Sequence, residues 1–150
     1  GANVQILLEI TAGQGTNLGH RFEHLATILD LVRDPYRLGV CFDTCHAFAA
    51  GYPMGSEPDY RRTMCELDRT IGIKLVKAFH LNDSKREFGS RVDRHEHIGR
   101  GHLGRAPFRH ILNDLRFRRT PMYLETPKGV EKGRDLDVSN LRTLRRLVGR

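Results

Sequence analysis

The amino-acid sequence predicts an α/β fold in which a parallel sheet is built from four strand–helix units. Two observations support this prediction: four short apolar segments, and a helical pattern after each of them. The apolar segments are nearly continuous rather than alternating, which is typical of strands that are covered on both faces. Strands that alternate with helices favour a parallel sheet joined by crossover helices.

The predicted elements follow one another in a regular order. The strand-like segments are residues 4–10, 36–42, 74–81 and 121–125. The segments with apolar residues at helical spacing are 20–33, 59–71, 106–117 and 137–148. The longest irregular piece is residues 82–105, and a loop of that length in a compact domain is usually functional.

The composition is that of one globular domain with no stretch near the ~18 apolar residues of a membrane span. Of the 150 residues, 39% are hydrophobic and 29% are charged, and the formal net charge is +7. Residues 101–150 carry most of this charge, with 12 basic and 5 acidic side chains. Such a surface favours phosphate-bearing partners, including nucleic acid, although a solvated helix face explains it as well.

The three cysteines, Cys41, Cys45 and Cys65, do not form a disulfide framework. An odd count of this kind indicates a reducing compartment, so we expect a cytoplasmic protein. The first apolar run has no basic leader, and no signal peptide is expected. We expect Cys41 to pack in the core and Cys45 to pack beside a site rather than to bind a metal.

Residues of metal-ligand type stand at the ends of all four predicted strands: Glu9, Asp43, His80 and Glu125. The carboxyl ends of parallel strands converge on one face, so these side chains should share a small volume. Three carboxylates that close would repel one another unless a cation neutralised them. A surface carboxylate or helix cap explains any one of them, but four in phase predict a divalent metal.

A second set of candidate ligands follows in the sequence. His46 is three residues past Asp43, and Asp93 and His95 are two apart, which puts both on one face of an extended segment. Imidazole and carboxylate ligands of this kind suit zinc. His97 has the same parity as His95, so the sequence alone leaves it open as a ligand.

Other histidines and glycines are weaker signals. Three histidines fall in helical stretches and are expected at the surface: His20, His24 and His110. Glycine-bearing loops at 11–17, 88–91 and 98–104 allow close approach of a ligand, but glycines also simply make turns. His102, in the last of these loops, is a candidate phosphate contact.

Four segments together resemble the motifs of the endonuclease IV family of zinc-dependent apurinic/apyrimidinic endonucleases: "LLEITAGQGTNLG", "CFDTCH", "FHLNDSK…GSRVDRHEHIGRGHLG" and "YLETP". The likeness runs from about residue 6 to about residue 128, with Ile10 as a minor departure. The resemblance implies an eight-stranded TIM barrel, which needs ~250 residues. Residues 1–150 would then be a single partial domain, the C-terminal half with strands five to eight, and the N-terminal half would be absent.

The resemblance also implies a trinuclear zinc centre with seven ligands in this chain: Glu9, Asp43, His46, His80, Asp93, His95 and Glu125. Glu9 would bridge two zinc ions, and Asp43, His80 and Glu125 would complete the second. His46, Asp93 and His95 would hold the third. The first zinc would also need two histidines from strands that this chain does not contain.

The implied activity is that of a DNA-repair hydrolase of base excision repair, a deoxyribonuclease IV. It cuts the phosphodiester 5′ to an abasic site and leaves a 3′-hydroxyl and a 5′-deoxyribose phosphate. Glu9 and Glu125 would be the catalytic carboxylates, Glu9 as the bridge and Glu125 orienting or deprotonating the nucleophile. The candidate contacts to double-stranded DNA are Lys85, Arg91 and Arg94, and Asp83 is a candidate hydrogen-bond acceptor for a ligating histidine.

Two other readings remain open from the sequence. A metal-dependent sugar isomerase or epimerase on a related barrel also places Glu, Asp, His and Glu on successive strand ends. That group does not need the second Asp-x-His set or a charge of +7. A non-catalytic metal- or DNA-binding fragment is the other alternative, because four strands cannot close a barrel. The isolated chain is expected to have little activity, and to self-associate or depend on the missing half.

Overall fold

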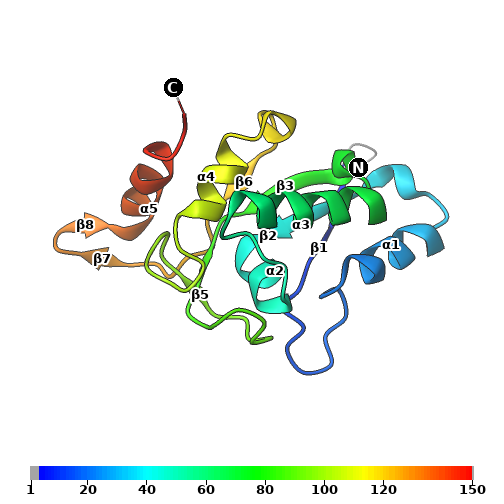
Figure 1. Cartoon of the computed structure of the whole chain (residues 1–150), viewed down its shortest axis with the longest axis horizontal. Helices are drawn as coiled ribbons and strands as arrows, with labels where there is room; N and C mark the ends of the chain where they lie inside the picture. Colours follow the sequence, from blue (N-terminus) through cyan, green and yellow to red (C-terminus); the bar gives the residue numbers. More distant parts are fainter. Residues whose placement is uncertain (1–3, 150) are drawn as a thin grey trace.

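The computed structural model describes residues 4–149 and arranges them around one parallel sheet (Figure 1). The strand order is β1-β2-β3-β6, and every pairing is parallel. The bounds are Ile6–Glu9 for β1, Leu38–Asp43 for β2, Val76–His80 for β3 and Met122–Tyr123 for β6. All four strands fall inside the predicted segments except that β2 runs one residue further, so the predicted α/β class is confirmed.

The inner and outer strands of the sheet differ in burial. Strand β2 is buried at all six positions, and its register sets Asp43 beside His80 of β3. The outer strands β1 and β6 each pair on one side, and Ile6 and Tyr123 are 56% and 54% exposed. The sheet therefore has two open edges that carry apolar side chains.

The four predicted helices are present and succeed one another along the sheet, from α1 to α5 (Figure 1). Their bounds are Phe22–Leu31 for α1, Glu57–Thr70 for α3, Ala106–Leu112 for α4 and Leu136–Arg145 for α5. Helix α4 is shorter than predicted and is followed by a 3₁₀ turn, η3, at Leu115–Phe117. The Asp114 side chain accepts the Arg116 N–H there, which starts a new turn instead of extending the helix.

One helix was not predicted. Helix α2, Thr44–Ala50, begins directly after β2 and lies outside every segment that the sequence predicts as helical. The Asp43 carboxylate caps it by accepting the His46 N–H, and Gly51, with φ of 103°, ends it in the left-handed conformation. His46 is therefore held on the first turn of a helix, which fixes its direction more firmly than a turn would.

Two hairpins and two short 3₁₀ turns complete the described chain. Strands β4 (Asp83–Ser84) and β5 (His95–Glu96) pair antiparallel inside the long segment that was predicted as irregular. Strands β7 (Val130–Glu131) and β8 (Arg134–Asp135) form the second hairpin. The turns η1 and η2 span Pro35–Arg37 and Ile73–Leu75 and precede β2 and β3.

Aromatic side chains bind the helices to the sheet. The rings of Phe42 and Phe79, on β2 and β3, lie 5.6 Å apart, and Phe117 meets Phe79 edge-on at 4.7 Å. Each such burial stabilises the fold by about 1.5–3 kcal/mol.

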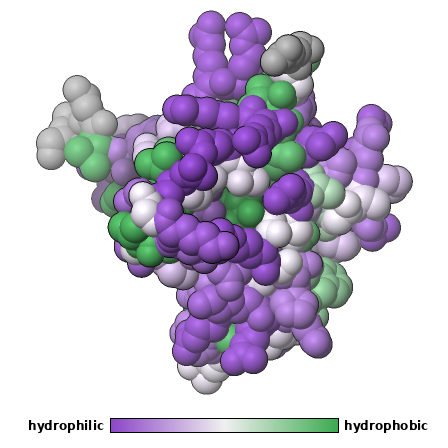
Figure 2. Space-filling view, turned by 90° about the vertical axis from the view of Figure 1, so that its left-hand side faces the viewer, coloured by the Kyte–Doolittle hydropathy of each residue, from purple (hydrophilic) through white to green (hydrophobic). Residues whose placement is uncertain are grey.

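Viewed from the side of α5, the surface is mainly hydrophilic, with hydrophobic residues exposed between the polar side chains (Figure 2). Within residues 4–149, no helix is long and apolar enough to cross a membrane.

Candidate metal centre

The carboxyl ends of the four strands bring together what we call the strand-end group: Glu9, Asp43, His80 and Glu125. Glu9, Asp43 and His80 are the last residues of β1, β2 and β3, and Glu125 is two residues past β6. Their ligand atoms all lie within 4.8 Å of one another. His80 Nδ1 is 2.9 Å from Glu9 Oε1 and 3.2 Å from Glu125 Oε2. The convergence that the sequence predicts is present in the structure.

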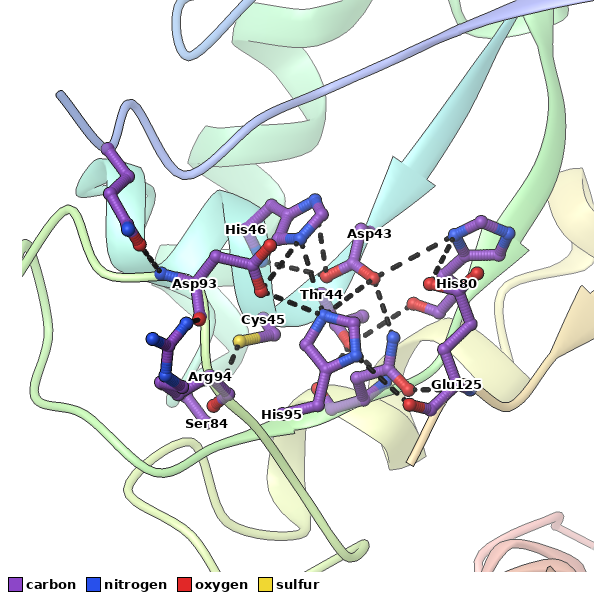
Figure 3. Close-up of polar contacts among 12 residues, drawn as sticks. Asp43, Thr44, Cys45, His46, His80, Ser84, Asp93, Arg94, His95 and Glu125 are labelled. Atoms are coloured by element: carbon purple, nitrogen blue, oxygen red, sulfur yellow. Dashed lines mark hydrogen bonds and ion pairs between the residues drawn. The ribbon is translucent and has the colours of Figure 1, made fainter. Parts of the chain in front are cut away.

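Beside it lies the loop group, which consists of His46, Asp93 and His95 (Figure 3). The Nε2 atoms of His46 and His95 are each 3.2 Å from Asp93 Oδ1 and 3.3 Å from one another. These three donor atoms form a nearly equilateral triangle. The edge of a tetrahedron of zinc ligands at 2.0–2.1 Å is about 3.3 Å, so the spacing fits three ligands of one zinc ion. Their role as ligands stays a prediction.

Asp43 joins the two groups and is fully buried. Its Oδ1 accepts the His46 N–H at 2.8 Å, and its Oδ2 accepts an N–H of Asn82 at 2.6 Å. The Asn82 amide oxygen in turn accepts the Glu125 N–H at 2.9 Å. The sequence reasoning missed Asn82, although its place two residues after His80 puts it on the same face of an extended chain.

Backbone carbonyl groups determine which ring nitrogen of each histidine in the loop group donates a hydrogen bond. His46 Nδ1 lies 2.8 Å from the Ile10 carbonyl oxygen, and His95 Nδ1 lies 3.2 Å from that of Glu125. Each Nδ1–H donates to its carbonyl, which leaves the Nε2 atoms free toward Asp93. This is the second hydrogen bond that metal-ligating histidines normally make. Asp83, expected to be such an acceptor, instead accepts backbone N–H groups, so that expectation was wrong.

Without a metal ion, the histidines themselves balance the carboxylates. Burial alone would raise the pKa of Glu9, but the adjacent imidazoles of His46 and His80 outweigh it and lower that pKa to about 2. Hydrogen bonds with Cys41 and Glu9 raise the pKa of His80 to about 11. Burial opposes the charge of His46, yet Glu9 and the nearby aspartates raise its pKa to about 9. A divalent ion would take over this neutralising role.

Burial raises the pKa of the Asp43 carboxyl, because it is surrounded by protein on every side. Burial likewise raises the pKa of the Cys45 thiol, to about 12. Cys45 Sγ lies near Asp93 and His95 but donates to the Arg94 carbonyl oxygen at 3.7 Å. A protonated thiol with that partner packs beside the loop group, in line with the expectation from the sequence.

The remaining predicted residues lie around these groups. His97, which the sequence left open, is buried with its Nδ1 3.1 Å from the side-chain nitrogen of Asn140 on α5, away from both groups. Arg94 lies between Asp93 and His95 and donates to the Asp93 carbonyl oxygen. Lys85 and Arg91 lie on the loop between β4 and β5, and Lys85 is exposed. That these three basic residues contact DNA stays a prediction.

Gln14 is a further residue that sequence reasoning missed. Its side-chain oxygen accepts the Asp93 N–H at 3.0 Å, so the first glycine-bearing loop supports the loop group. Nothing in the local sequence marks this contact, since 79 positions separate the two residues. Loop 11–17 therefore contributes to the loop group through the Gln14 side chain.

Comparison with known proteins agrees with this fold. The family described as "Xylose isomerase-like TIM barrel" matches residues 1–147, and the chain belongs to that family. Its four parallel strands and their helices correspond to half of such a barrel. Within the family, the chain is 58% identical over 144 residues to "Probable endonuclease 4" of Citrifermentans bemidjiense, covering 96% of this chain and 50% of that protein.

Two further relatives support the same assignment. The chain is 55% identical over 148 residues to "Probable endonuclease 4" of Chloroflexus aurantiacus, covering 99% of this chain and 51% of the relative. The crystal structure of endonuclease IV from Thermus thermophilus superposes with a TM-score of 0.80 at 42% identity, over 94% of this chain and 48% of that one. The chain spans about half the length of the curated relatives it matches.

Proposed function

We propose that the chain is the metal-bearing part of a DNA-repair endonuclease that hydrolyses the phosphodiester 5′ to an abasic site. The observation that carries this proposal is the pair of adjacent ligand groups that share Asp43. The similarity to proteins named endonuclease 4 supports it. A sugar isomerase on a related barrel would need the strand-end group but not the triangle formed by His46, Asp93 and His95.

Zinc is the ion that we propose for both groups, because their donors are imidazole nitrogens and carboxylate oxygens. Glu9, Asp43, His80 and Glu125 would hold one ion, and His46, Asp93 and His95 another. Glu9 Oε1 lies 2.9 Å from His80 Nδ1, so Glu9 would contribute to the strand-end ion. As a bridging ligand it would also reach the first zinc, whose two histidines this chain does not contain. When bound, zinc in such a centre supplies Lewis-acid polarisation of a phosphoryl oxygen and a water that ionises near neutral pH.

Asp43 and Glu125 differ in exposure, and this difference indicates a different role for each. Asp43 is fully buried and hydrogen-bonded on both oxygens, so it would hold the metal from below without reaching the substrate. Glu125 has a side chain that is 46% exposed and a backbone N–H held by Asn82. A carboxylate on a fixed backbone that faces solvent can orient an attacking water and accept its proton. We assign that role to Glu125.

The substrate is an anion, and the loop beside the loop group is basic. Lys85, Arg91 and Arg94 lie on the segment that connects β4 to β5 and leads into His95. Cations on this segment would orient the DNA backbone and make binding depend on salt. Discrimination of an abasic nucleotide would rest on its low cost of extrusion from the duplex.

The open sheet edges need partners, and we propose that the four strands are strands five to eight of an eight-stranded barrel. Exposed Val4 and Ile6 lie along one edge, and Tyr123 lies along the other. Next to β6 an apolar cavity of about 390 Å³ opens between Met122 and Leu141. Either four further strands or a second copy of the chain would cover these surfaces.

The free cysteines favour a reducing, cytoplasmic compartment.

A completed barrel tests the proposal. The chain would be joined to the N-terminal half of the Citrifermentans bemidjiense relative and loaded with zinc. A duplex with one tetrahydrofuran abasic analogue should be cut 5′ to the lesion, leaving a 3′ end that a polymerase extends. The undamaged duplex should stay intact, chelation should stop cutting, and the isolated chain should show little activity. A zinc-loaded chimera that leaves the abasic duplex intact would contradict the proposal.

A further inference from the structure

Helix α5 has a buried amide side chain on the face that packs against the rest of the chain. Asn140 is 3% exposed and lies four residues before Leu144, which is 6% exposed on the same face of the helix. Asn140 belongs to neither ligand group. Burial of an amide is unfavourable unless its hydrogen bonds are made. A buried asparagine where an apolar side chain would also pack therefore indicates specific partners.

The side chain of Asn140 makes three hydrogen bonds, and all of them go to segments outside its own helix. Its Oδ1 accepts the Ile98 N–H at 3.0 Å, which identifies the oxygen end of the amide. Its Nδ2 donates to Thr126 Oγ1 at 2.9 Å and to His97 Nδ1 at 3.1 Å. These partners are at most 9% exposed. Hydrogen bonds that are shielded from water in this way are stronger than those at a surface.

The two segments that Asn140 joins each carry a residue of the proposed metal centre. Its partners in the first segment lie two and three residues after His95 of the loop group. Its partner in the second segment, Thr126, directly follows Glu125 of the strand-end group. The same two segments also meet inside the centre, where His95 Nδ1 donates to the Glu125 carbonyl oxygen at 3.2 Å (Figure 3). Asn140 therefore holds together the stretches of chain whose contact orients the His95 ring.

This contact needs support because neither residue lies within a long strand. Strand β5 has two residues, and Glu125 lies two residues past the end of β6. A ladder of backbone hydrogen bonds fixes the chain only where strands pair, so side chains must fix the rest. Asn82 accepts the Glu125 N–H at 2.9 Å. Asn140 holds the next residue along, Thr126, so the chain is held on both sides of Glu125.

We infer that Asn140 is a positioning residue of the proposed metal centre, because its amide fixes the two segments that carry His95 and Glu125. The inference rests on the proposed function, which supplies the zinc ions and their ligands. In this role Asn140 touches neither the metal nor the substrate. It acts by keeping the His95 ring in the direction that one shared zinc ion requires.

The loop group should be the more sensitive of the two groups. The other two donor atoms of this group lie 3.2 and 3.3 Å from His95 Nε2, and this spacing depends on the direction of the ring. Loss of the Asn140 amide would leave the Ile98 N–H without its partner and the chain after His95 free to move. Glu125 would keep its hydrogen bond to Asn82. Groups that hold metal-ligating residues in place typically contribute about 10–100-fold to metal affinity.

The test measures zinc affinity of the chain itself, by competition with a chromophoric chelator near neutral pH. Asn140→Leu keeps the size of the side chain and removes all three hydrogen bonds. It should bind one of the two proposed zinc ions about 10–100-fold more weakly. Thr126→Val removes one acceptor and keeps the shape of the side chain, so it should weaken the same ion by a smaller factor.

Asn140→Asp is the conservative variant. Its carboxylate accepts the Ile98 N–H as before, and the Thr126 hydroxyl and the His97 ring can each turn a proton toward it. All three contacts can therefore form, and N140D should bind zinc nearly as tightly as the unmodified chain. Zinc binding as weak in N140D as in N140L would overturn the inference.

Leu144→Ala is the matched control, because it leaves a cavity on the same face of α5 and removes no hydrogen bond. Chemical denaturation confirms that each variant is folded and ranks the stability losses. L144A should lower stability at least as much as N140L and leave zinc affinity unchanged. An equal loss of zinc affinity in the two variants would overturn the inference, and so would failure of the unmodified chain to bind zinc.

Incision separates this inference from the proposed function. The zinc-loaded chimera, with Asn140 unchanged, is tested in parallel on the abasic duplex. Efficient incision, together with equal zinc affinity in N140L and the unmodified chain, refutes the positioning role alone. Weakened zinc binding in N140L, together with no incision by the fully zinc-loaded chimera, refutes the proposed function alone.

Discussion

The inner strands of the sheet and its outer strands contribute differently to the metal centre. Inner strands β2 and β3 end on Asp43, which is fully buried and hydrogen-bonded, and on His80, whose side chain is 19% exposed. Outer strand β1 ends on Glu9 and β6 leads to Glu125, with side chains that are 33% and 46% exposed. The buried positions of the two ligand groups are thus supplied by this chain, while Glu9 and Glu125, the proposed catalytic carboxylates, lie toward the two open edges.

This difference separates what the chain can do alone from what needs a partner. Burial of the inner strands comes from helices that the chain itself supplies, so binding of metal by Asp43 and its neighbours should not need the rest of a barrel. Pairing at the edges would set the surroundings of Glu9 and Glu125. We therefore expect metal binding to survive in the isolated chain and incision to depend on completion of the barrel.

The largest expected effect is the difference in zinc content between a variant of an inner-strand ligand and a variant of an outer-strand ligand. Asp43→Asn should remove zinc from both groups, because an amide N–H would face either His46 or Asn82 and the shared anion is lost. Glu125→Gln should leave the zinc of the loop group in place and slow incision by the chimera about 10²–10⁴-fold. Zinc per chain is measured by mass spectrometry, with exposed Asp30→Asn as control. Equal zinc loss in the two variants would break the comparison.

Next in size is the pH dependence of zinc binding. In the metal-free chain the pKa of His46 is about 9 and that of His80 about 11, both above the usual value near 6.5. Zinc must displace these protons at any pH below 9, so its apparent affinity should rise with pH. The rise from pH 6 to 9 should be about tenfold per pH unit for each proton released. Competition with a chromophoric chelator measures it.

The control for the pH series is His46→Gln, which removes one of the two titrating rings. It should reduce the pH dependence of the zinc affinity by about one proton.

The same pKa shifts also affect the folding stability of the chain without metal. Because both folded-state pKa values are raised, their stabilisation is complete below about pH 6.5 and is lost as pH rises through 9 and 11. A thermal midpoint of the metal-free chain that rises with pH over this range would contradict the assignment.

A charged substitution on an outer strand tests whether the open edges of the sheet cause self-association. Isolated chains should self-associate, and Ile6→Lys on β1 should shift them to monomer, because an edge lysine opposes strand pairing. Val130→Lys is the matched control, since Val130 is exposed on the β7–β8 hairpin away from the sheet. Sedimentation velocity measures the distribution of species. A monomeric unmodified chain would show that the edges are tolerated without a partner.

The smallest effect is expected far from both regions. Ser56 caps α3 by accepting the Asp59 N–H at 3.2 Å. Ser56→Ala should lower the free energy of unfolding by about 1 kcal/mol, as for other helix caps. Chemical denaturation measures the change, and zinc content should not alter. A change in zinc content would mean that the outer helices and the metal centre are coupled more closely than the contacts suggest.

Much of the fold and of the centre could be predicted from the sequence, because both depend on local patterns. Continuous apolar runs predicted β1, β2, β3 and β6, and strand ends predicted that Glu9, Asp43, His80 and Glu125 converge. Helix α2 was missed because its seven residues are too few to show a helical repeat of apolar side chains. The roles of Asn82, Gln14 and Asp83 were missed or misjudged because hydrogen bonds between distant segments leave no mark in local spacing.

The sequence by itself determined the alternation of strands and helices and the types of side chain that stand at the strand ends, since these follow from periodicity and from chain order. Only the tertiary structure decided that Asp43 joins two ligand groups, that His97 turns away to Asn140, and that Asp83 holds a loop rather than a histidine. Those outcomes depend on which distant donors and acceptors meet when water is excluded. A buried polar atom takes the partner that the packing brings to it.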